Sequence, residues 1–249
     1  MNYGMTGKVA LVTGASGGIG RASALAFAES GARVVVSDVN EAGGGETVAM
    51  IAATGGQAVF QRCDVSNADD VKALVARALS AFGRLDYAHN NAGINDLRLD
   101  EWDEAVYDRS IAVNQKGVML CIREEVAAML GNGGGAIVNT SSINGLVGNA
   151  MQPGYVSAKH GVVGLTRHAA LNWARDGIRV NAVCPGVIVT PMTESLSANP
   201  AIKASMEQMT PMGRMGQPEE VAGAVVWLCS DQASFVTGHA MVIDGGATA

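Results

Sequence analysis

The stretch Lys8-Val9-Ala10-Leu11-Val12-Thr13-Gly14-Ala15-Ser16-Gly17-Gly18-Ile19-Gly20 decides the fold of this chain. Residues 8–13 form a short, continuous apolar run, which predicts a strand buried on both faces of a parallel sheet. Glycines follow at once, and an apolar-periodic segment then continues to Ser30. Strand, glycine turn and helix form the context of a phosphate-binding loop, because glycines let the backbone approach a pyrophosphate and a helix N-terminus offers free N–H groups. The spacing departs from G-x-G-x-x-G, and a glycine-rich turn without a ligand is the alternative.

A second predicted strand, residues 33–38, ends in an acidic side chain. A carboxylate at this place can accept hydrogen bonds from both ribose hydroxyls of adenosine, and it would repel a 2′-phosphate. No basic residue stands at Gly17 or directly after Asp38, where one could hold that phosphate. Asp38 therefore favours NAD over NADP. The alternative is a solvated acid at a strand end.

Strand-like and helix-like segments alternate along the rest of the chain. Strands are predicted at 57–63, 85–89, 136–140, 178–184 and 240–243, and helices at 41–54, 102–129, 155–174 and from 218 onward. The glycines at 43–45 predict an irregular first turn for the helix at 41–54. Ser66 with Asp69 predicts the capped start of a further helix. The alternation predicts a single α/β domain over 1–249, a doubly wound Rossmann-type fold with a seven-stranded parallel sheet and helices on both faces.

Two segments interrupt this alternation. Residues 96–103 are predicted to form a polar loop. Residues 190–215 are rich in methionine and are predicted to be irregular, as an insertion that covers the substrate, because thioethers adapt to varied shapes. A core-facing helix is the alternative for this methionine-rich part.

Composition narrows the possible partners. The chain has 249 residues, 48% of them hydrophobic, and a formal net charge of −6. There is no run of Lys or Arg, which argues against nucleic acid and anionic membranes as partners. No signal peptide or membrane span is visible, so we expect a cytoplasmic protein. The cysteines lack metal-binding or disulfide spacing and are expected to be buried free thiols: Cys63, Cys121, Cys184 and Cys229. His89 lacks a metal-binding partner and is expected to be structural.

Tyr155-Val156-Ser157-Ala158-Lys159 carries the predicted chemistry. On a helix, the four-residue step places Tyr155 and Lys159 on one face, one turn apart. A neighbouring ammonium favours the phenolate and lowers the tyrosine pKa, so Tyr155 could act as a general acid or base. The alternative is an ordinary amphipathic surface helix. Ser142 lies at the carboxyl end of the strand at 136–140, and Asn114 lies in mid-helix, where an amide is unfavourable unless it has a role.

Taken together in this order, these motifs resemble the short-chain dehydrogenase/reductase family over essentially the whole chain. The matching motifs are Thr13-Gly14-x3-Gly18-Ile19-Gly20, Asp64-Val65, Asn90-Asn91-Ala92-Gly93, Asn114, Ser142, Tyr155-x3-Lys159, Pro185-Gly186 with Thr190, and Asp244-Gly245-Gly246. The resemblance implies that Tyr155 is the general acid or base and that Lys159 lowers its pKa and holds the nicotinamide ribose. It implies that Ser142 binds the substrate oxygen and that Asn114 holds a water linking Lys159 to solvent.

The resemblance also implies where the cofactor NAD and the substrate bind. Asp38 would bind the adenosine ribose, Asp64 the adenine, and Thr190 with the Ile188 backbone the carboxamide. The full set expected at the cofactor is Gly14, Ser16, Gly17, Gly18, Ile19, Gly20, Asp38, Asp64, Val65, Asn90, Asn91, Ala92, Gly93, Tyr155, Lys159, Pro185, Gly186, Ile188, Thr190 and Met192. The expected substrate walls, mostly apolar, are Ile143, Asn144, Met151, Val187 and Leu196. No metal is expected.

The implied reaction interconverts a hydrophobic secondary alcohol and its ketone, with cyclic alcohols among the candidates, in a homotetramer that packs the long helices holding Asn114 and Tyr155. One alternative is a 3-oxoacyl-type reductase of the same family, which usually prefers NADP and docks an acidic carrier through arginines near the ends of those helices. Here the corresponding places hold Gly133 and Asp176. Another alternative is a non-catalytic NAD-binding sensor on the same fold.

Overall fold

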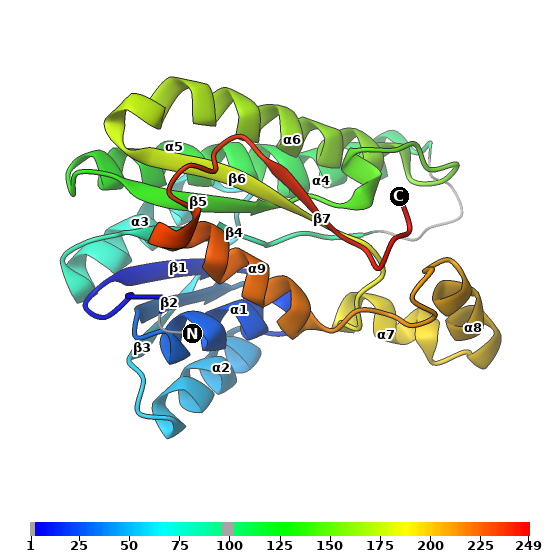
Figure 1. The fold of residues 1–249 in the computed structure, drawn as a ribbon, viewed down its shortest axis with the longest axis horizontal. Coiled ribbons are helices and arrows are strands. Elements are labelled where there is room, and N and C mark those ends of the chain that lie inside the picture. The colour runs from blue at the N-terminus through cyan, green and yellow to red at the C-terminus, as the bar shows by residue number, and fades with distance from the viewer. Residues whose placement is uncertain (1–2, 96–101) are drawn as a thin grey trace.

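The computed structural model describes residues 3–95 and 102–249, except the side chain of Ser195, and is built on a seven-stranded sheet in the order β3-β2-β1-β4-β5-β6-β7 (Figure 1). Every pair of neighbouring strands is parallel. The strands are β1 (Val9–Thr13), β2 (Arg33–Asp38), β3 (Ala58–Arg62), β4 (Tyr87–Asn90), β5 (Gly135–Thr140), β6 (Ile178–Pro185) and β7 (Ala240–Ile243). The predicted sheet is therefore confirmed, with strand bounds that shift by at most two residues.

Helices cover both faces of the sheet, as predicted (Figure 1). One face is covered by α1 (Gly18–Glu29), α2 (Glu41–Ala53) and α9 (Pro218–Cys229), and the other by α3 (Ala68–Phe82), α5 (Gly117–Leu130) and α6 (Pro153–Trp173). The remaining helices are α4 (Glu104–Ile111), α7 (Pro191–Ser197) and α8 (Pro200–Gln208), with a π turn η1 (Ala112–Lys116) and 3-10 turns η2 (Ile143–Gly145), η3 (Ala174–Asp176) and η4 (Asp231–Ala233).

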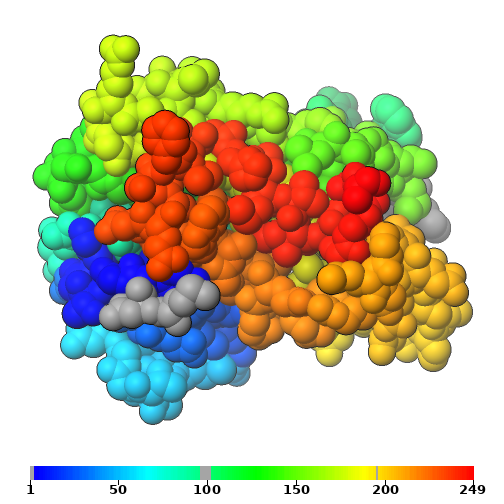
Figure 2. All heavy atoms as spheres, in the orientation of Figure 1, coloured from blue at the N-terminus to red at the C-terminus, as the bar shows by residue number. Residues whose placement is uncertain are grey.

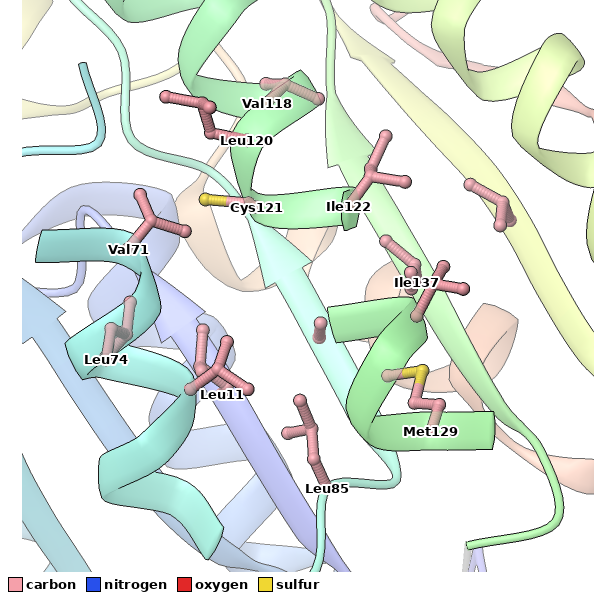
Figure 3. Close-up of a cluster of buried hydrophobic side chains, with 14 of the residues drawn as sticks. Leu11, Val71, Leu74, Leu85, Val118, Leu120, Cys121, Ile122, Met129 and Ile137 are labelled. Carbon is pink, nitrogen blue, oxygen red and sulfur yellow. The ribbon is translucent and has the colours of Figure 1, made fainter. Parts of the chain in front are cut away.

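The two faces of the sheet bury separate hydrophobic cores, and β1 contributes to both. Val9 and Leu11 belong to the core under α3 and α5, whereas Ala10 and Val12 belong to the core under α1 and α9. Figure 3 shows the first core, in which Leu11 lies near Leu74 and Leu85. Because successive side chains of a strand point to opposite faces, a strand that is buried on both faces must be apolar throughout. This is why the run at 8–13 predicts its position correctly.

Two helix starts differ from the predictions. The helix α2 is regular from Glu41, because the side chain of Asn40 caps it by accepting a hydrogen bond from the Gly43 N–H at 3.2 Å. Its glycines serve close packing, since a Cβ on Gly44 would lie 2.1 Å from the ring of Phe60. The cap of α3 is not Ser66 but Asn67, whose Oδ1 accepts from the Asp69 N–H at 2.9 Å.

The helix predicted at 102–129 is continuous but not regular. It begins at Glu104 as α4, widens into the π turn η1 and continues as α5 to Leu130. A π turn holds one residue more than an α turn and is frequent at functional sites. Here the residue at its centre is Asn114, which is fully buried. Most of the polar loop predicted at 96–103 lies outside the described residues.

The methionine-rich segment forms helices, which corrects the prediction that it is irregular. Each of α7 and α8 begins with a proline, and the side chains of Thr190 and Asn199 cap their N-termini. Figures 1 and 2 show this segment as a lobe at the edge of the molecule, next to the C-terminal residues. Met192, Met209 and Met212 are 40%, 62% and 69% exposed, so they do not face the core.

Other expectations concern cysteines and membrane spans. The four cysteines are buried free thiols, as predicted. Within residues 3–95 and 102–249, no helix has the length and apolar character needed to cross a membrane.

Candidate active site

A cavity of about 330 Å³ opens at the carboxyl ends of the central strands. Most of the residues expected at the cofactor line it: Gly14, Ser16, Gly17, Gly18, Ile19, Asp38, Asn91, Gly93, Tyr155, Lys159, Pro185, Gly186, Ile188, Thr190 and Met192. In an open parallel sheet, ligands bind at this edge, at the point where strand order reverses between β1 and β4. The topology therefore brings together residues that are distant in sequence.

The turn between β1 and α1 is shaped to hold a phosphate group. Gly14 has φ +65°, and a Cβ there would lie 2.8 Å from the Cα of Ala92. Gly18 has φ +52°, and a Cβ there would lie 3.1 Å from Thr190. The N-cap residue of α1 is Gly17, which has no side chain to cap the helix, and both Gly17 and Gly18 line the cavity. Free N–H groups and a positive helix end suit the pyrophosphate of a dinucleotide.

Gly20 has a different role from the one predicted. It does not line the cavity, and a Cβ on it would lie 2.0 Å from the Gly14 carbonyl oxygen. Its lack of a side chain allows the helix to pack against the turn. Sequence reasoning missed Arg21, whose guanidinium donates to the Ser16 carbonyl and to the Gly43 carbonyl at 3.1 Å. Arg21 thereby ties the turn to α2.

Asp38 lies where the first cavity meets a second one of about 410 Å³. Its Oδ2 accepts from the Ser16 N–H at 3.0 Å and its Oδ1 from the Asn40 N–H at 2.9 Å. The second cavity is lined by further residues of the predicted set: Asp64, Val65, Ala92 and Gly93. Asp64 is held by Ser66, whose N–H and hydroxyl donate to Oδ1 at 2.9 and 2.7 Å. These two acids thus stand along one continuous wall.

The two neighbouring asparagines after β4 point to different environments. Asn91 lines the cavity, and its Nδ2 donates to the carbonyls of Thr13 and Gly14, each at 3.2 Å. Asn90 is buried in the core instead, where its Nδ2 donates to Glu125 Oε2 at 2.9 Å and to Asn139 Oδ1 at 3.0 Å. The prediction that Asn90 lines the cofactor site is therefore wrong: of the two adjacent side chains, only that of Asn91 lines the cavity.

Tyr155 and Lys159 stand one turn apart on α6 and both line the cavity, as the spacing predicts. The Tyr155 hydroxyl forms a hydrogen bond with the Ser142 side chain. The Lys159 Nζ lies 5.4 Å from the centroid of the Tyr155 ring and donates to the Thr140 carbonyl at 2.9 Å. Ser141 Oγ donates to the Lys159 carbonyl at 2.8 Å, which holds the helix against the end of β5.

The electrostatics of this pair differ from the expectation. Burial raises the pKa of Tyr155, and the hydrogen bond from Ser142 lowers it by a smaller amount. Burial also lowers the pKa of Lys159 to about 8. Desolvation penalises the charged form of either group. In the ligand-free chain, burial therefore outweighs the effect of the lysine charge on the phenol.

Asn114 lies close to this pair through the π turn. Its Oδ1 accepts from the Ile94 N–H at 2.8 Å, and its Nδ2 donates to the Ile94 carbonyl at 2.9 Å. A Cβ on Gly93 would lie 2.9 Å from Asn114 Oδ1 and 3.5 Å from Lys159 Nζ, so Gly93 separates the two side chains. The amide in mid-helix thus fixes the chain after β4, and its role in holding a water stays a prediction.

The residues expected at the substrate are not brought together. Ile143, Asn144, Met151, Val187 and Leu196 line neither of the two cavities, and Met151 is 56% exposed. Four residues that sequence reasoning did not select line the first cavity: Thr140, Ser141, Pro191 and Thr193. Thr190 and Thr193 form a capping box at the start of α7, and this spacing is the signal that could have identified Thr193. Within the described residues, no group of three His, Cys, Asp or Glu side chains could hold a metal ion.

Comparison with known proteins agrees with this geometry. Residues 14–248 match the family model described as enoyl-(acyl carrier protein) reductase. The chain is 46% identical to a 2,5-dichloro-2,5-cyclohexadiene-1,4-diol dehydrogenase of Sphingobium indicum, over 98% of each chain. It is 46% identical to the cyclohexanol dehydrogenase of an Acinetobacter species, over 100% of this chain and 98% of the relative.

A solved structure gives the same result for the whole fold. The crystal structure of a short-chain type dehydrogenase/reductase from Mycobacterium marinum superposes with a TM-score of 0.94 at 38% identity, covering 99% of this chain and 98% of that one. Members of this family use nicotinamide cofactors, and the turn after β1, Asp38 and the uncapped α1 terminus fit such a group. The chain belongs to the short-chain dehydrogenase/reductase family.

Proposed function

We propose that the protein is an NAD(H)-dependent oxidoreductase that interconverts a hydrophobic, cyclic secondary alcohol and its ketone, with Tyr155 as the general acid and base. The observation that carries this proposal is that Tyr155, Lys159 and Asp38 line one cavity, and that Ser142 forms a hydrogen bond with the Tyr155 hydroxyl. A proton-transfer group and a ribose-binding carboxylate then belong to a single site.

The side chains suggest how the proton moves. Ser142 would hold the substrate oxygen beside the Tyr155 hydroxyl, which takes the alcohol proton in oxidation and returns it in reduction. Lys159 would stabilise the phenolate while its own charge is held near the Thr140 carbonyl. When bound, a nicotinamide cofactor supplies the hydride acceptor or donor, which no side chain provides.

The preference for NAD rests on Asp38. Its carboxylate stands where the cavities meet, and the residues that follow it, Val39 and Asn40, carry no positive charge. A 2′-phosphate at that place would meet the negative charge of Asp38, and the residues directly after Asp38 supply no cation to offset it. A free ribose could instead donate both hydroxyls to the carboxylate.

The substrate class rests on the relatives and on the cavity walls. The relatives at 46% identity are named for cyclic alcohols. The part of the cavity wall that comes from α7 is formed by Pro191, Met192 and Thr193, of which the first two are apolar. A compact ring with few polar groups suits such a wall. We also propose a homotetramer that covers the exposed Met119, Leu130 and Leu171 of α5 and α6, which light scattering of the purified protein would test.

The experiment is an NAD(H)-linked screen of cyclic and linear secondary alcohols and ketones, run in both directions with NAD(H) and NADP(H). We expect turnover of cyclic alcohols with NAD. Turnover only of 3-oxoacyl thioesters with NADPH would favour the carrier-protein reductase alternative. Nucleotide binding without turnover of any compound would favour the sensor.

A further inference from the structure

A directional chain of hydrogen bonds runs beneath the cavity, and it begins at a buried histidine. His89 Nε2 lies 2.8 Å from Thr140 Oγ1, and Thr140 Oγ1 donates to Asn91 Oδ1 at 3.3 Å. Asn91 Nδ2 then donates to the Gly14 carbonyl at 3.2 Å. The chain crosses from β4 to β5 and ends at the glycine turn after β1.

The direction of these bonds fixes the protonation state of the histidine. The Thr140 hydroxyl has a single proton, which goes to Asn91, so its oxygen must accept from His89. Nε2 therefore carries a proton, and because burial lowers the pKa of His89 to about 3, the ring is neutral and Nδ1 is left as an acceptor. His89 is fully buried, and Nδ1 has no partner among the described residues. A buried acceptor without a partner costs stability, so this histidine is not explained by packing alone.

What the chain holds in place is the wall of the cavity. Thr140, Asn91 and Gly14 all line it, and the Thr140 carbonyl accepts from Lys159 Nζ at 2.9 Å. An amide side chain can turn over and exchange its oxygen and nitrogen. A donor at Thr140 keeps Asn91 Oδ1 toward β5 and therefore keeps Nδ2 toward the Gly14 turn.

We propose that His89 is a positioning residue for the cofactor site, acting through Thr140 to fix the Asn91 amide and the Gly14 turn. This inference rests on the proposed function, in which the cavity takes a nicotinamide dinucleotide. It assigns His89 no contact with the cofactor or the substrate. When His89 is replaced by a residue without an N–H donor, the inference predicts that stability is kept or rises and that cofactor affinity falls.

The test compares His89→Phe and His89→Gln in the full-length protein, with NADH binding followed by fluorescence and stability by thermal unfolding. Phenylalanine fills the site without a donor, so we expect an equal or higher Tm and an NADH Kd raised about fivefold, as for one lost hydrogen bond. Glutamine can donate to Thr140, and we expect it to restore the Kd to within about twofold. If His89 had only a structural role, the His89→Phe protein would be less stable, and His89→Gln would not restore the NADH Kd.

A double-mutant cycle keeps the inference testable if His89→Phe folds poorly. Thr140→Val removes the middle hydroxyl, so His89→Gln in that background should leave the NADH Kd where Thr140→Val alone places it. Nitrogen NMR of the cofactor-free protein should show the Nε2–H tautomer at His89. The Nδ1–H tautomer, or an unchanged Kd in both His89→Phe and Thr140→Val, would overturn the inference. A wild-type protein that binds no NADH would instead overturn the proposed function.

Discussion

The two ends of the active-site cavity are built in different ways. At the nucleotide end, side chains bind the backbone of the turns that follow the strands: Asp38 accepts from the N–H groups of Ser16 and Asn40, and Asn91 donates to the turn after β1. At the substrate end, Met192 of α7 and the residues Met209 and Met212 after α8 are exposed, and Arg214, which follows them, pairs with Glu220 of α9 at 2.7 Å. The nucleotide end is therefore fixed before a ligand arrives, whereas the substrate end can adapt to different shapes.

The largest expected effect lies at the proton-transfer residue. Tyr155→Phe removes the proton-transfer group, so kcat should fall by about 10²- to 10⁴-fold while the NADH Kd changes by less than about twofold. Steady-state kinetics and NADH fluorescence measure the two quantities. Tyr3→Phe, which removes a phenol far from the cavity, is the matched control. A near-normal rate in Tyr155→Phe would remove Tyr155 from the mechanism.

The second effect tests the nucleotide end. Asp38→Asn keeps the shape of the side chain and removes its charge, while Asp38→Ala removes its hydrogen bonds as well. In both variants we expect the preference for NAD over NADP, measured as the ratio of kcat/KM values, to fall by about tenfold or more. If the ratio stays at the wild-type value in both, residues other than Asp38 set the cofactor choice.

A third effect concerns the core beneath the nucleotide end, where burial raises the pKa of Glu125 to about 8 from an ordinary 4.5. Between these values the folded chain binds a proton that the unfolded chain has released, so stability falls as pH rises from about 4.5 to 8. Between pH 5.5 and 8.5, the free energy of unfolding should fall by roughly 1–3 kcal/mol less in Glu125→Gln than in the wild type. Urea unfolding at the two pH values measures this difference. Cys121 does not interfere, because burial raises its pKa well above 9.0. If the free energy of unfolding changes equally with pH in the wild type and in Glu125→Gln, Glu125 is not neutral in the folded chain.

The smallest effect is expected at the substrate end. Met192 is 40% exposed and lines the cavity, so Met192→Ala should change the substrate KM by only about two- to fivefold and stability by less than about 0.5 kcal/mol. Met209 is 62% exposed and lines neither of the two cavities, which makes Met209→Ala the control. A change in the substrate KM of about tenfold or more, as large as the change in cofactor preference expected for Asp38→Ala, would mean that this end is as fixed as the other.

The difference between the two ends also explains how far sequence reasoning reached. The ends of parallel strands meet at one edge of the sheet, so the local patterns at Gly14, Asp38 and Lys159 were enough to predict the cavity. The order of strands and helices followed from periodicity in the same way. These are properties of single segments.

What could not be predicted depends on the direction of side chains in three dimensions. Asn90 and Asn91 are adjacent and alike, and only the packing of α5 decides that Asn90 faces Glu125. The expected substrate walls, such as Ile143 and Met151, lie in irregular segments without a period that would fix their orientation. The same limit applies to the Tyr155 pKa, since spacing along a helix reveals a neighbouring charge but not the extent of burial.

The π turn at Ala112–Lys116 divides one continuous helix into two parts with separate tasks. Only Ser110 of α4 is buried, whereas eight side chains or backbones of α5, from Gly117 to Met129, are buried in the core. Because the π turn holds one extra residue, the face of α4 is rotated relative to the face that a regular helix would present. The buried face of α5 therefore does not continue along α4. Substitutions on the largely exposed α4 can therefore change the surface of the molecule, while the structural half of the same helix remains insulated from them.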